Sequence, residues 1–233
     1  MDLNDPSRRA LLGFPAALAP GLATAQSVPE VDLLLVLAMD ASGSIDTEEF
    51  RLQREGLASA LTDPAVIQLA TAGRNRSIAL ALVEWGSPGG AMTVVNWMRL
   101  QDAGSAATVA QAIRSAPRSL QSYNAIGDAI AHATALIRTA PFRSKDRVID
   151  VAGDGPDLRS LLPAPQARDQ AVARDITVNA LAIEVSPVTR FGVPLREHYE
   201  RNVIGGDGAF VMVAQTRADF ARAIRAKLMR EIA

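Results

Sequence analysis

Residues 31–46 read VDLLLVLAMDASGSID, and this stretch decides the fold. Its first part, Val31–Met39, is an almost unbroken apolar run, which is typical of a strand buried on both faces of a parallel sheet. A short polar loop that starts at Asp40 follows at once. Asp46 and Glu49 then have the spacing of a capping box, so they predict the start of a helix. A buried strand, a polar loop and a helix in this order indicate an α/β unit.

Strand-like and helix-like runs alternate along the rest of the chain. Strands are expected at 31–39, 77–85, 92–98, 147–152, 176–184 and 209–213. Helices are expected from 46, after Asp63-Pro64, and at 106–115, 125–139, 165–174, 195–202 and 216–232. Because helices separate most of the strands, the pattern predicts a doubly wound, mostly parallel six-stranded sheet with helices on both faces. The turn before 92–98 makes that strand an antiparallel edge strand, and we expect 26–233 to form one domain.

The composition argues against several classes of protein. The chain has 233 residues, with 24 basic and 25 acidic side chains, whereas a nucleic-acid-binding protein needs a surplus of Lys and Arg to neutralise phosphates. Only 4% of the residues are aromatic, so a platform that stacks bases is not expected either. The chain has no cysteine, which excludes disulfides, thiolate zinc sites, iron–sulfur clusters and cysteine nucleophiles.

Residues 1–25 are typical of an export signal. Arg8 and Arg9 precede an apolar stretch at Leu11–Leu22, and Ala23-Thr24-Ala25 matches a cleavage site between small residues. The arginine pair also resembles the twin-arginine signal for folded cargo, although a pair of arginines in an ordinary Sec signal fits the same pattern. Prolines and a glycine interrupt the stretch, so it is a poor membrane-spanning helix. We therefore expect a periplasmic or secreted bacterial protein with no membrane span after cleavage.

Oxygen-bearing side chains surround the expected carboxyl edge of the sheet. Asp40, Ser42 and Ser44 follow the first strand, Asp154 follows the fourth, and Asn124 precedes the fourth helix. In such sheets, ligands bind beyond the carboxyl ends of the strands, so these residues predict a single site. Carboxylate, hydroxyl and amide oxygens are hard ligands, which suit Mg²⁺ or Mn²⁺. A bound cation would also balance two carboxylates that otherwise repel each other.

The motif Asp40-x-Ser42-x-Ser44, with Asp154 after a later strand, resembles the metal-ion-dependent adhesion site of von Willebrand factor type A (VWA) domains. The resemblance covers 31–232. Several stretches are similar to a bacterial family of exported proteins that has this fold and no assigned function. These stretches are VDLLLVLAMDASGSID, QREGLASAL, VEW, RVIDVAGDGPD and VIGGDGAF.

The resemblance implies a binding module without enzymatic activity. In VWA domains, two serines and a threonine coordinate Mg²⁺, aspartates act directly or through water, and a carboxylate of a partner protein completes the shell. The ligands implied here are Asp40, Ser42, Ser44, Asn124 and Asp154. Asn124 stands where the family has threonine, and its amide oxygen is longer and aimed differently. It fits a second role equally well, as the N-cap of the helix that follows it.

Two other functions are open at this point. Haloacid-dehalogenase-type phosphohydrolases also place an Asp after the first strand, and the loop at 153–157, with Lys145 upstream, partly resembles one of theirs. Those enzymes use a second Asp as general acid. Ser42 stands at that position here, and a serine hydroxyl cannot act as a general acid near neutral pH. A structural VWA domain that binds no metal is the third possibility.

We expect structural roles for several other polar residues. Asp46 is expected to cap its helix, and Asp128 to favour the dipole at the start of another. Asp157 is expected in a solvated loop. His132 is expected to be packed in a helix, whereas His198 is expected at the surface.

Overall fold

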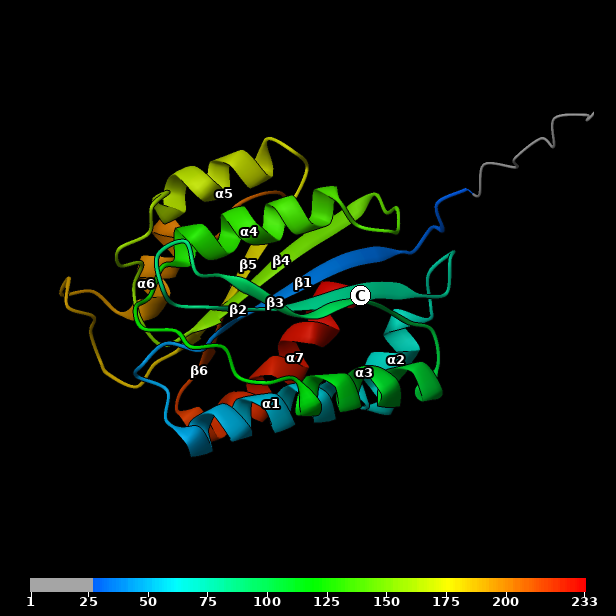
Figure 1. Ribbon diagram of the computed structural model, residues 1–233, viewed down its shortest axis with the longest axis horizontal. Helices are drawn as coiled ribbons and strands as arrows, with labels where there is room; N and C mark the ends of the chain where they lie inside the picture. The colour runs from blue at the N-terminus through cyan, green and yellow to red at the C-terminus, as the bar shows by residue number, and fades with distance from the viewer. Residues whose placement is uncertain (1–26) are drawn as a thin grey trace, which may run out of the picture.

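The computed structural model describes residues 27–233, which fold around one six-stranded sheet (Figure 1). The strands are β1 (Leu33–Asp40), β2 (Ile78–Trp85), β3 (Met92–Leu100), β4 (Asp146–Gly153), β5 (Thr177–Ile183) and β6 (Val211–Ala214). Their order in the sheet is β3-β2-β1-β4-β5-β6, and only β3 runs antiparallel to its neighbour. This arrangement confirms the predicted sheet.

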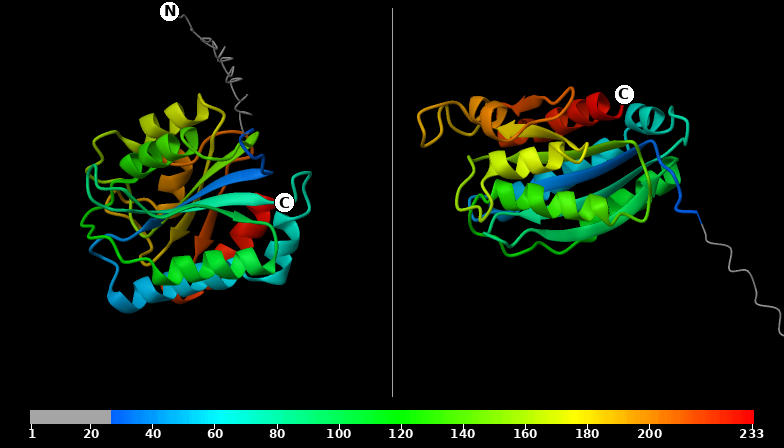
Figure 2. Two further views of the ribbon diagram at one scale, coloured as in Figure 1. Left: turned by 45° about the vertical axis from the view of Figure 1, so that its right-hand side comes forward. Right: turned by 90° about the horizontal axis from the view of Figure 1, so that it is seen from above.

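Two layers of helices enclose the sheet. The helices are α1 (Thr47–Leu61), α2 (Pro64–Ala70), α3 (Ala103–Ser115), α4 (Ile126–Arg138), α5 (Ala164–Val172), α6 (Leu195–Asn202) and α7 (Phe220–Ile232). One face of the sheet packs against α1, α2, α3 and α7, and the other against α4, α5 and α6 (Figures 1 and 2). Alternate residues of β1 enter the two apolar layers, which explains why its sequence is apolar on both faces.

Most element boundaries differ from the prediction by one to three residues. Strand β3 continues to Leu100, beyond the predicted end at 98. The predicted closing helix at 216–232 is divided into a 3₁₀ turn, Arg217–Asp219, and α7. Thr216 caps this turn, since its hydroxyl accepts the Asp219 N–H at 3.2 Å. The turn places Arg217 next to the carboxyl edge of the sheet.

The central strands bring distant residues to one edge. Met39 on β1 pairs with Ala152 on β4, so Asp40 and Asp154 follow neighbouring parallel strands at the same edge. Asp40 also pairs in register with Trp85 at the end of β2. Trp85 is fully buried, and its ring lies where a Cβ on Gly153 would come within 2.9 Å of it. The carboxyl edge of the sheet is therefore packed closely against the Trp85 indole.

The predicted export signal at 1–25 lies outside the described residues and stays a prediction. Within 27–233, the structure contains no helix with the length and apolar character needed to span a bilayer.

Candidate metal site

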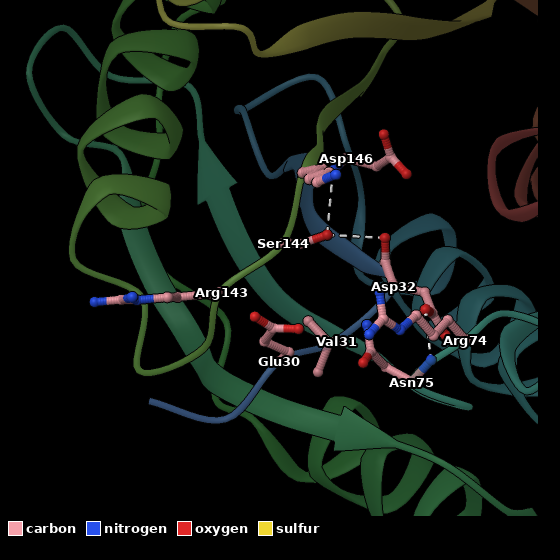
Figure 3. A pocket seen from close by; sticks show the side chains of 9 residues that line it. Glu30, Val31, Asp32, Arg74, Asn75, Arg143, Ser144 and Asp146 are labelled. Carbon is pink, nitrogen blue, oxygen red and sulfur yellow. Dashed lines mark hydrogen bonds between the residues drawn. The ribbon is translucent and has the colours of Figure 1, made fainter. Parts of the chain in front are cut away.

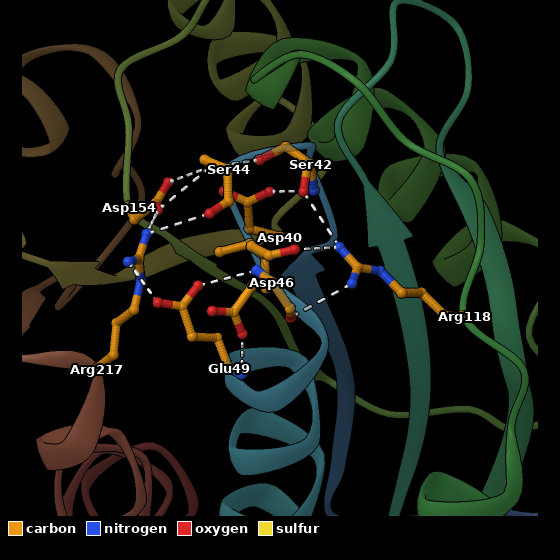
Figure 4. A network of polar contacts seen from close by, with 9 residues as sticks. Asp40, Ser42, Ser44, Asp46, Glu49, Arg118, Asp154 and Arg217 are labelled. Atoms are coloured by element: carbon orange, nitrogen blue, oxygen red, sulfur yellow. Dashed lines mark hydrogen bonds and ion pairs between the residues drawn. The ribbon is translucent and has the colours of Figure 1, made fainter.

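The loop after β1 gathers the predicted oxygens of the site (Figure 4). Asp40 is buried, and its Oδ1 accepts the backbone N–H of Ser42 at 2.8 Å. The hydroxyls of Ser42 and Ser44 lie 3.0 Å apart. The Ser44 hydroxyl also donates to Asp154 Oδ1 at 3.3 Å, across the loop that follows β4. The structure thus brings four of the five predicted ligands into one hydrogen-bonded cluster.

The electrostatics of this cluster favour a positive charge beside it. Burial, with a further contribution from the negative charge of Asp154, raises the pKa of the Asp40 carboxyl from 3.8 to about 7. The N–H of Ser42 acts in the opposite direction, because it stabilises the ionised form. The hydrogen bonds of the protein therefore compensate only part of the negative charge of Asp40 and Asp154.

Asn124 lies against the same loops. If Gly155 carried a Cβ, that atom would lie 2.2 Å from Asn124 Nδ2, so the close approach requires glycine. The backbone carbonyl of Asn124 accepts the Leu158 N–H at 2.6 Å, while its side-chain Oδ1 is buried and has no hydrogen-bond partner in the described chain. The structure places Asn124 beside the loop that carries Asp154.

The alternative role of Asn124 as a helix cap is wrong. Helix α4 has Ala125 at its N-cap, and no side chain caps it from that position. Asp157 instead accepts the N–H groups of Ile126 at 2.9 Å and Ala164 at 3.0 Å, so one carboxylate caps α4 and α5 from another loop. Asp157 is therefore not the solvated loop residue that was expected.

The expectation of an exposed His198 is also wrong. Its side chain is buried, its Nε2 lies 3.3 Å from the Asp157 N–H that donates to it, and its ring stacks on Phe191. Burial lowers the pKa of His198 below its ordinary value of 6.5. His132 is half-buried and pairs with the Thr93 hydroxyl at 2.9 Å, as expected of a packed helix residue.

Two further aspartates have structural roles. Asp46 caps α1 in a capping box with Glu49, which confirms the prediction. Asp128 is buried in the first turn of α4, where it accepts the N–H groups of Gly89 at 2.8 Å and Leu161 at 3.0 Å. Asp128 thus holds two loops of the carboxyl edge together in addition to favouring the helix dipole.

Arg217 is part of the cluster, although nothing in the sequence indicates that it lies at the site. Its guanidinium donates to Asp154 Oδ2 at 2.7 Å and to Glu49 Oε1 at 2.6 Å (Figure 4). It stands in the 3₁₀ turn before α7, far along the chain from both carboxylates. The guanidinium therefore supplies part of the positive charge that Asp154 needs.

A second arginine fixes the backbone of the serine loop. Arg118 donates to the carbonyl of Ile45 at 2.7 Å and to that of Ala41 at 3.3 Å. The segment that carries Arg118 is itself tied to β2, because buried Glu84 accepts the Ser119 N–H at 2.6 Å. Glu84 is in turn paired with Arg54 of α1. These contacts hold the loops in place before any ligand arrives.

The donor set fits the hard cation implied by the resemblance. Asp40 Oδ2 and Asn124 Oδ1 are buried oxygens with no hydrogen-bond partner in 27–233, and all the cluster ligands are oxygens. No group of three or more His, Asp or Glu side chains in the described chain is arranged to hold a metal ion. A cation here would therefore depend on hydroxyl and amide oxygens together with two carboxylates.

The geometry gives no support to the phosphohydrolase alternative. Lys145 precedes β4 and Asp154 follows it, so they stand at opposite ends of a strand roughly 25 Å long. The other acid of that loop is Asp157, which already accepts N–H groups at the starts of α4 and α5.

Comparisons with known proteins agree with this architecture. A family model described as "Protein of unknown function (DUF1194)" matches residues 30–233. No curated protein matches the sequence. Among solved structures, a von Willebrand factor type A protein from Catenulispora acidiphila has 19% identity and a TM-score of 0.60, over 87% of this chain and 43% of that one.

Two other similar structures come from the mussel byssus and from a bacterial pilus. Proximal thread matrix protein 1 from the mussel byssus, with a zinc-occupied MIDAS motif, has 16% identity and a TM-score of 0.61, over 87% of this chain and 46% of that one. The vWF domain of the type V pili tip protein Mfa5 from Porphyromonas gingivalis has 12% identity and a TM-score of 0.59, over 87% of this chain and 95% of that one.

The chain spans less than half the length of the first structures that it matches. At these identities the likeness concerns the fold. The six-stranded sheet with its single antiparallel edge strand is the VWA architecture, and the family match covers nearly the whole described chain. The protein thus has the fold of von Willebrand factor type A domains, and it belongs to the DUF1194 family.

Proposed function

We propose that the protein is an exported, non-enzymatic binding module that holds Mg²⁺ or Mn²⁺ and captures a carboxylate of a partner protein. The metal ligands in this proposal are Asp40, Ser42, Ser44, Asn124 and Asp154. One observation carries it: two oxygens at this edge, Asp40 Oδ2 and Asn124 Oδ1, are buried without a hydrogen-bond partner in 27–233. Such groups are costly to bury unless something else satisfies them.

The chain's own residues define how the site would work. The Ser42 N–H fixes one oxygen of Asp40 and leaves the other free for a ligand. Ser42 and Ser44 contribute neutral oxygens, which neutralise a cation less than carboxylates do. A divalent ion bound here would offer an open coordination position to an anionic group from outside. No residue of the cluster needs to exchange a proton or break a bond for this function.

Two of the similar structures support this proposal. The mussel protein carries zinc in its MIDAS motif, and another similar structure is the pilus adhesin SpaC from Lactobacillus rhamnosus GG. One is a protein of the mussel byssus and the other is a pilus adhesin, which is consistent with the export signal expected at 1–25. The absence of a phosphohydrolase acid at position 42 is consistent with a module that binds and does not catalyse.

Calorimetry of the purified protein tests the metal site directly. The protein is stripped with a chelator and titrated with Mg²⁺ and with Mn²⁺, and the Asp40→Ala variant is titrated in parallel. We expect one ion to bind to the wild type and none to the variant, whose circular dichroism stays native. An equal response of wild type and variant would refute the assignment.

The partner carboxylate is tested on a solid support. Wild-type protein is passed over a matrix that carries carboxylates and over the same matrix after conversion to amides. We expect retention only on the carboxylates, only with Mg²⁺ present, and elution by chelator. Retention that persists in the Asp40→Ala variant would show simple ion exchange and contradict the proposed capture.

A further inference from the structure

Four arginines line one cavity at the end of the sheet where the parallel strands begin. The cavity has a volume of about 710 Å³ and lies between the end of α4, the start of β4 and the turn that follows α5. We call it the arginine hollow, after Arg138, Arg143, Arg147 and Arg174. Its other lining residues are apolar or small, and no described residue that lines it is acidic.

The guanidinium groups of the hollow are not neutralised by the described chain. None of the four arginines forms an ion pair with a residue in 27–233. The Arg147 side chain is held by the carbonyls of Ser144 and Arg174, each at 3.2 Å, and Arg174 donates to the Gln170 carbonyl at 2.5 Å. Two of the side chains are therefore positioned by backbone oxygens and keep their full charge.

Acidic residues close to these arginines in the sequence line two neighbouring pockets. Glu30, Asp32 and Asp146 line the neighbouring pocket shown in Figure 3. Arg143 contributes to both pockets, and Figure 3 shows its side chain directed away from these three acids. Arg147 also lines a second pocket, together with Asp146 and Asp175, but no acidic residue in 27–233 forms an ion pair with an arginine of the hollow.

Helix dipoles explain only part of this cluster. Arg138 is the last residue of α4, and Arg174 follows α5, so both suit the negative ends of those helices. Arg143 and Arg147 belong to neither helix, because one precedes β4 and the other lies within it. Four guanidiniums around one cavity that form no ion pair within 27–233 therefore call for a further explanation.

We infer that the arginine hollow binds a ligand that carries two phosphate groups. A guanidinium pairs with an oxyanion through two parallel hydrogen bonds, and it is the preferred partner of phosphate. A phosphate monoester carries up to two negative charges near neutral pH and a phosphodiester carries one, so two phosphates bring two to four negative charges to the four arginines in a compact volume. Carboxylates would need four separate groups to supply four charges. The cavity volume is within the usual range of small-ligand sites.

Two sources offer this chemistry, a soluble diphosphate compound and the headgroup of a lipid with two phosphates. Pyrophosphate represents the first, and cardiolipin vesicles, compared with phosphatidylcholine vesicles, represent the second. The test variant is the double substitution Arg138→Gln and Arg174→Gln, at exposed positions. The control is Arg51→Gln with Arg196→Gln, which removes the same charge from exposed helix positions elsewhere. A chelator is present throughout, so that no metal mediates binding at the other edge.

Calorimetry and vesicle sedimentation then decide between the outcomes. We expect the wild type to bind pyrophosphate, cardiolipin vesicles or both, and the test variant to lose at least about tenfold in affinity while the control binds as the wild type does. Binding of pyrophosphate alone identifies a soluble ligand, and binding of vesicles alone identifies a headgroup. Equal losses in test and control variants, equal affinity for citrate, or no binding of either probe by the wild type would overturn the inference.

Discussion

At the residue scale, Asn124 decides how completely the site can enclose a cation. Its Oδ1 is buried and unpartnered in the described chain, so we expect Asn124→Ala to weaken Mg²⁺ binding by about tenfold, which corresponds to about 1.4 kcal/mol. We expect Asn124→Thr to bind Mg²⁺ more tightly than the wild type, because threonine supplies a shorter oxygen. Calorimetry of the three proteins measures both changes. Identical affinities would remove Asn124 from the ligand set.

Arg217 is expected to act against the metal. Its guanidinium is 2.7 Å from Asp154 Oδ2, so a cation at this carboxylate must share it with an existing positive charge. We predict that Arg217→Gln raises the affinity for Mg²⁺ by roughly tenfold. The same calorimetric titration, run at fixed ionic strength, measures the change.

Arg222 provides the matched control for Arg217. It follows in the next turn, and its exposed side chain pairs with Asp219 outside the cluster. Arg222→Gln removes the same charge, yet we expect the Mg²⁺ affinity of the wild type. A gain of similar size in both variants would mean that net charge, and not contact with Asp154, sets the affinity.

At the scale of elements, a buried ionic group fastens α7 to the sheet. Lys227 is fully buried and lies 2.5 Å from an oxygen of Asp150 on β4 and 2.5 Å from one of Glu231, while Asn179 on β5 donates to Glu231 at 3.0 Å. Burial, with a further contribution from the charge of Asp150, raises the pKa of Glu231 from 4.5 to about 7. The carboxyl of Glu231 is therefore more easily protonated in the folded state than in the unfolded state.

This raised pKa predicts a loss of stability as the pH rises. Between pH 4.5 and 7 the folded state holds more protons at Glu231 than the unfolded state, so its contribution to the free energy of unfolding falls across that window. In the wild type, we expect the free energy of unfolding to decline by on the order of 2 kcal/mol between pH 5 and pH 8 because of Glu231. We predict that Glu231→Gln removes this decline. Urea denaturation of both proteins at the two pH values measures it. Parallel pH profiles would contradict the prediction.

The elements themselves were largely predictable, while the contacts between them were not. The apolar run at 31–39 and the Asp–Ser loop after it carry local signals, and the structure confirms the strand and gathers the loop oxygens. Arg217 reaches Asp154 from 63 positions away, and Asp157 caps α4 from 31 positions beyond the N–H that it binds. No periodicity or spacing encodes these long-range contacts, because they depend on how the loops meet at the sheet edge.

At the scale of the whole molecule, metal binding should increase the stability of the folded protein. A ligand that binds only the folded state adds about 2.7 kcal/mol at a concentration 100 times its dissociation constant. We predict that Mg²⁺ raises the midpoint of thermal unfolding of the wild type in a concentration-dependent manner. Scanning calorimetry of wild type and Asp40→Ala measures the shift. An unchanged midpoint in both would favour the metal-free structural domain.

Trp85 gives the molecule an optical reporter of its own. The chain has two tryptophans, and the indole of Trp85 is fully buried beneath the edge that carries Asp40, whereas Trp97 is half-buried on the edge strand β3. In a Trp97→Phe variant, the fluorescence emission therefore comes from beside the candidate site alone. A cation that binds at Asp40 should shift this emission. The shift should saturate at the affinity measured by calorimetry, so the fluorescence of a buried tryptophan reports the occupancy of the site without any added label.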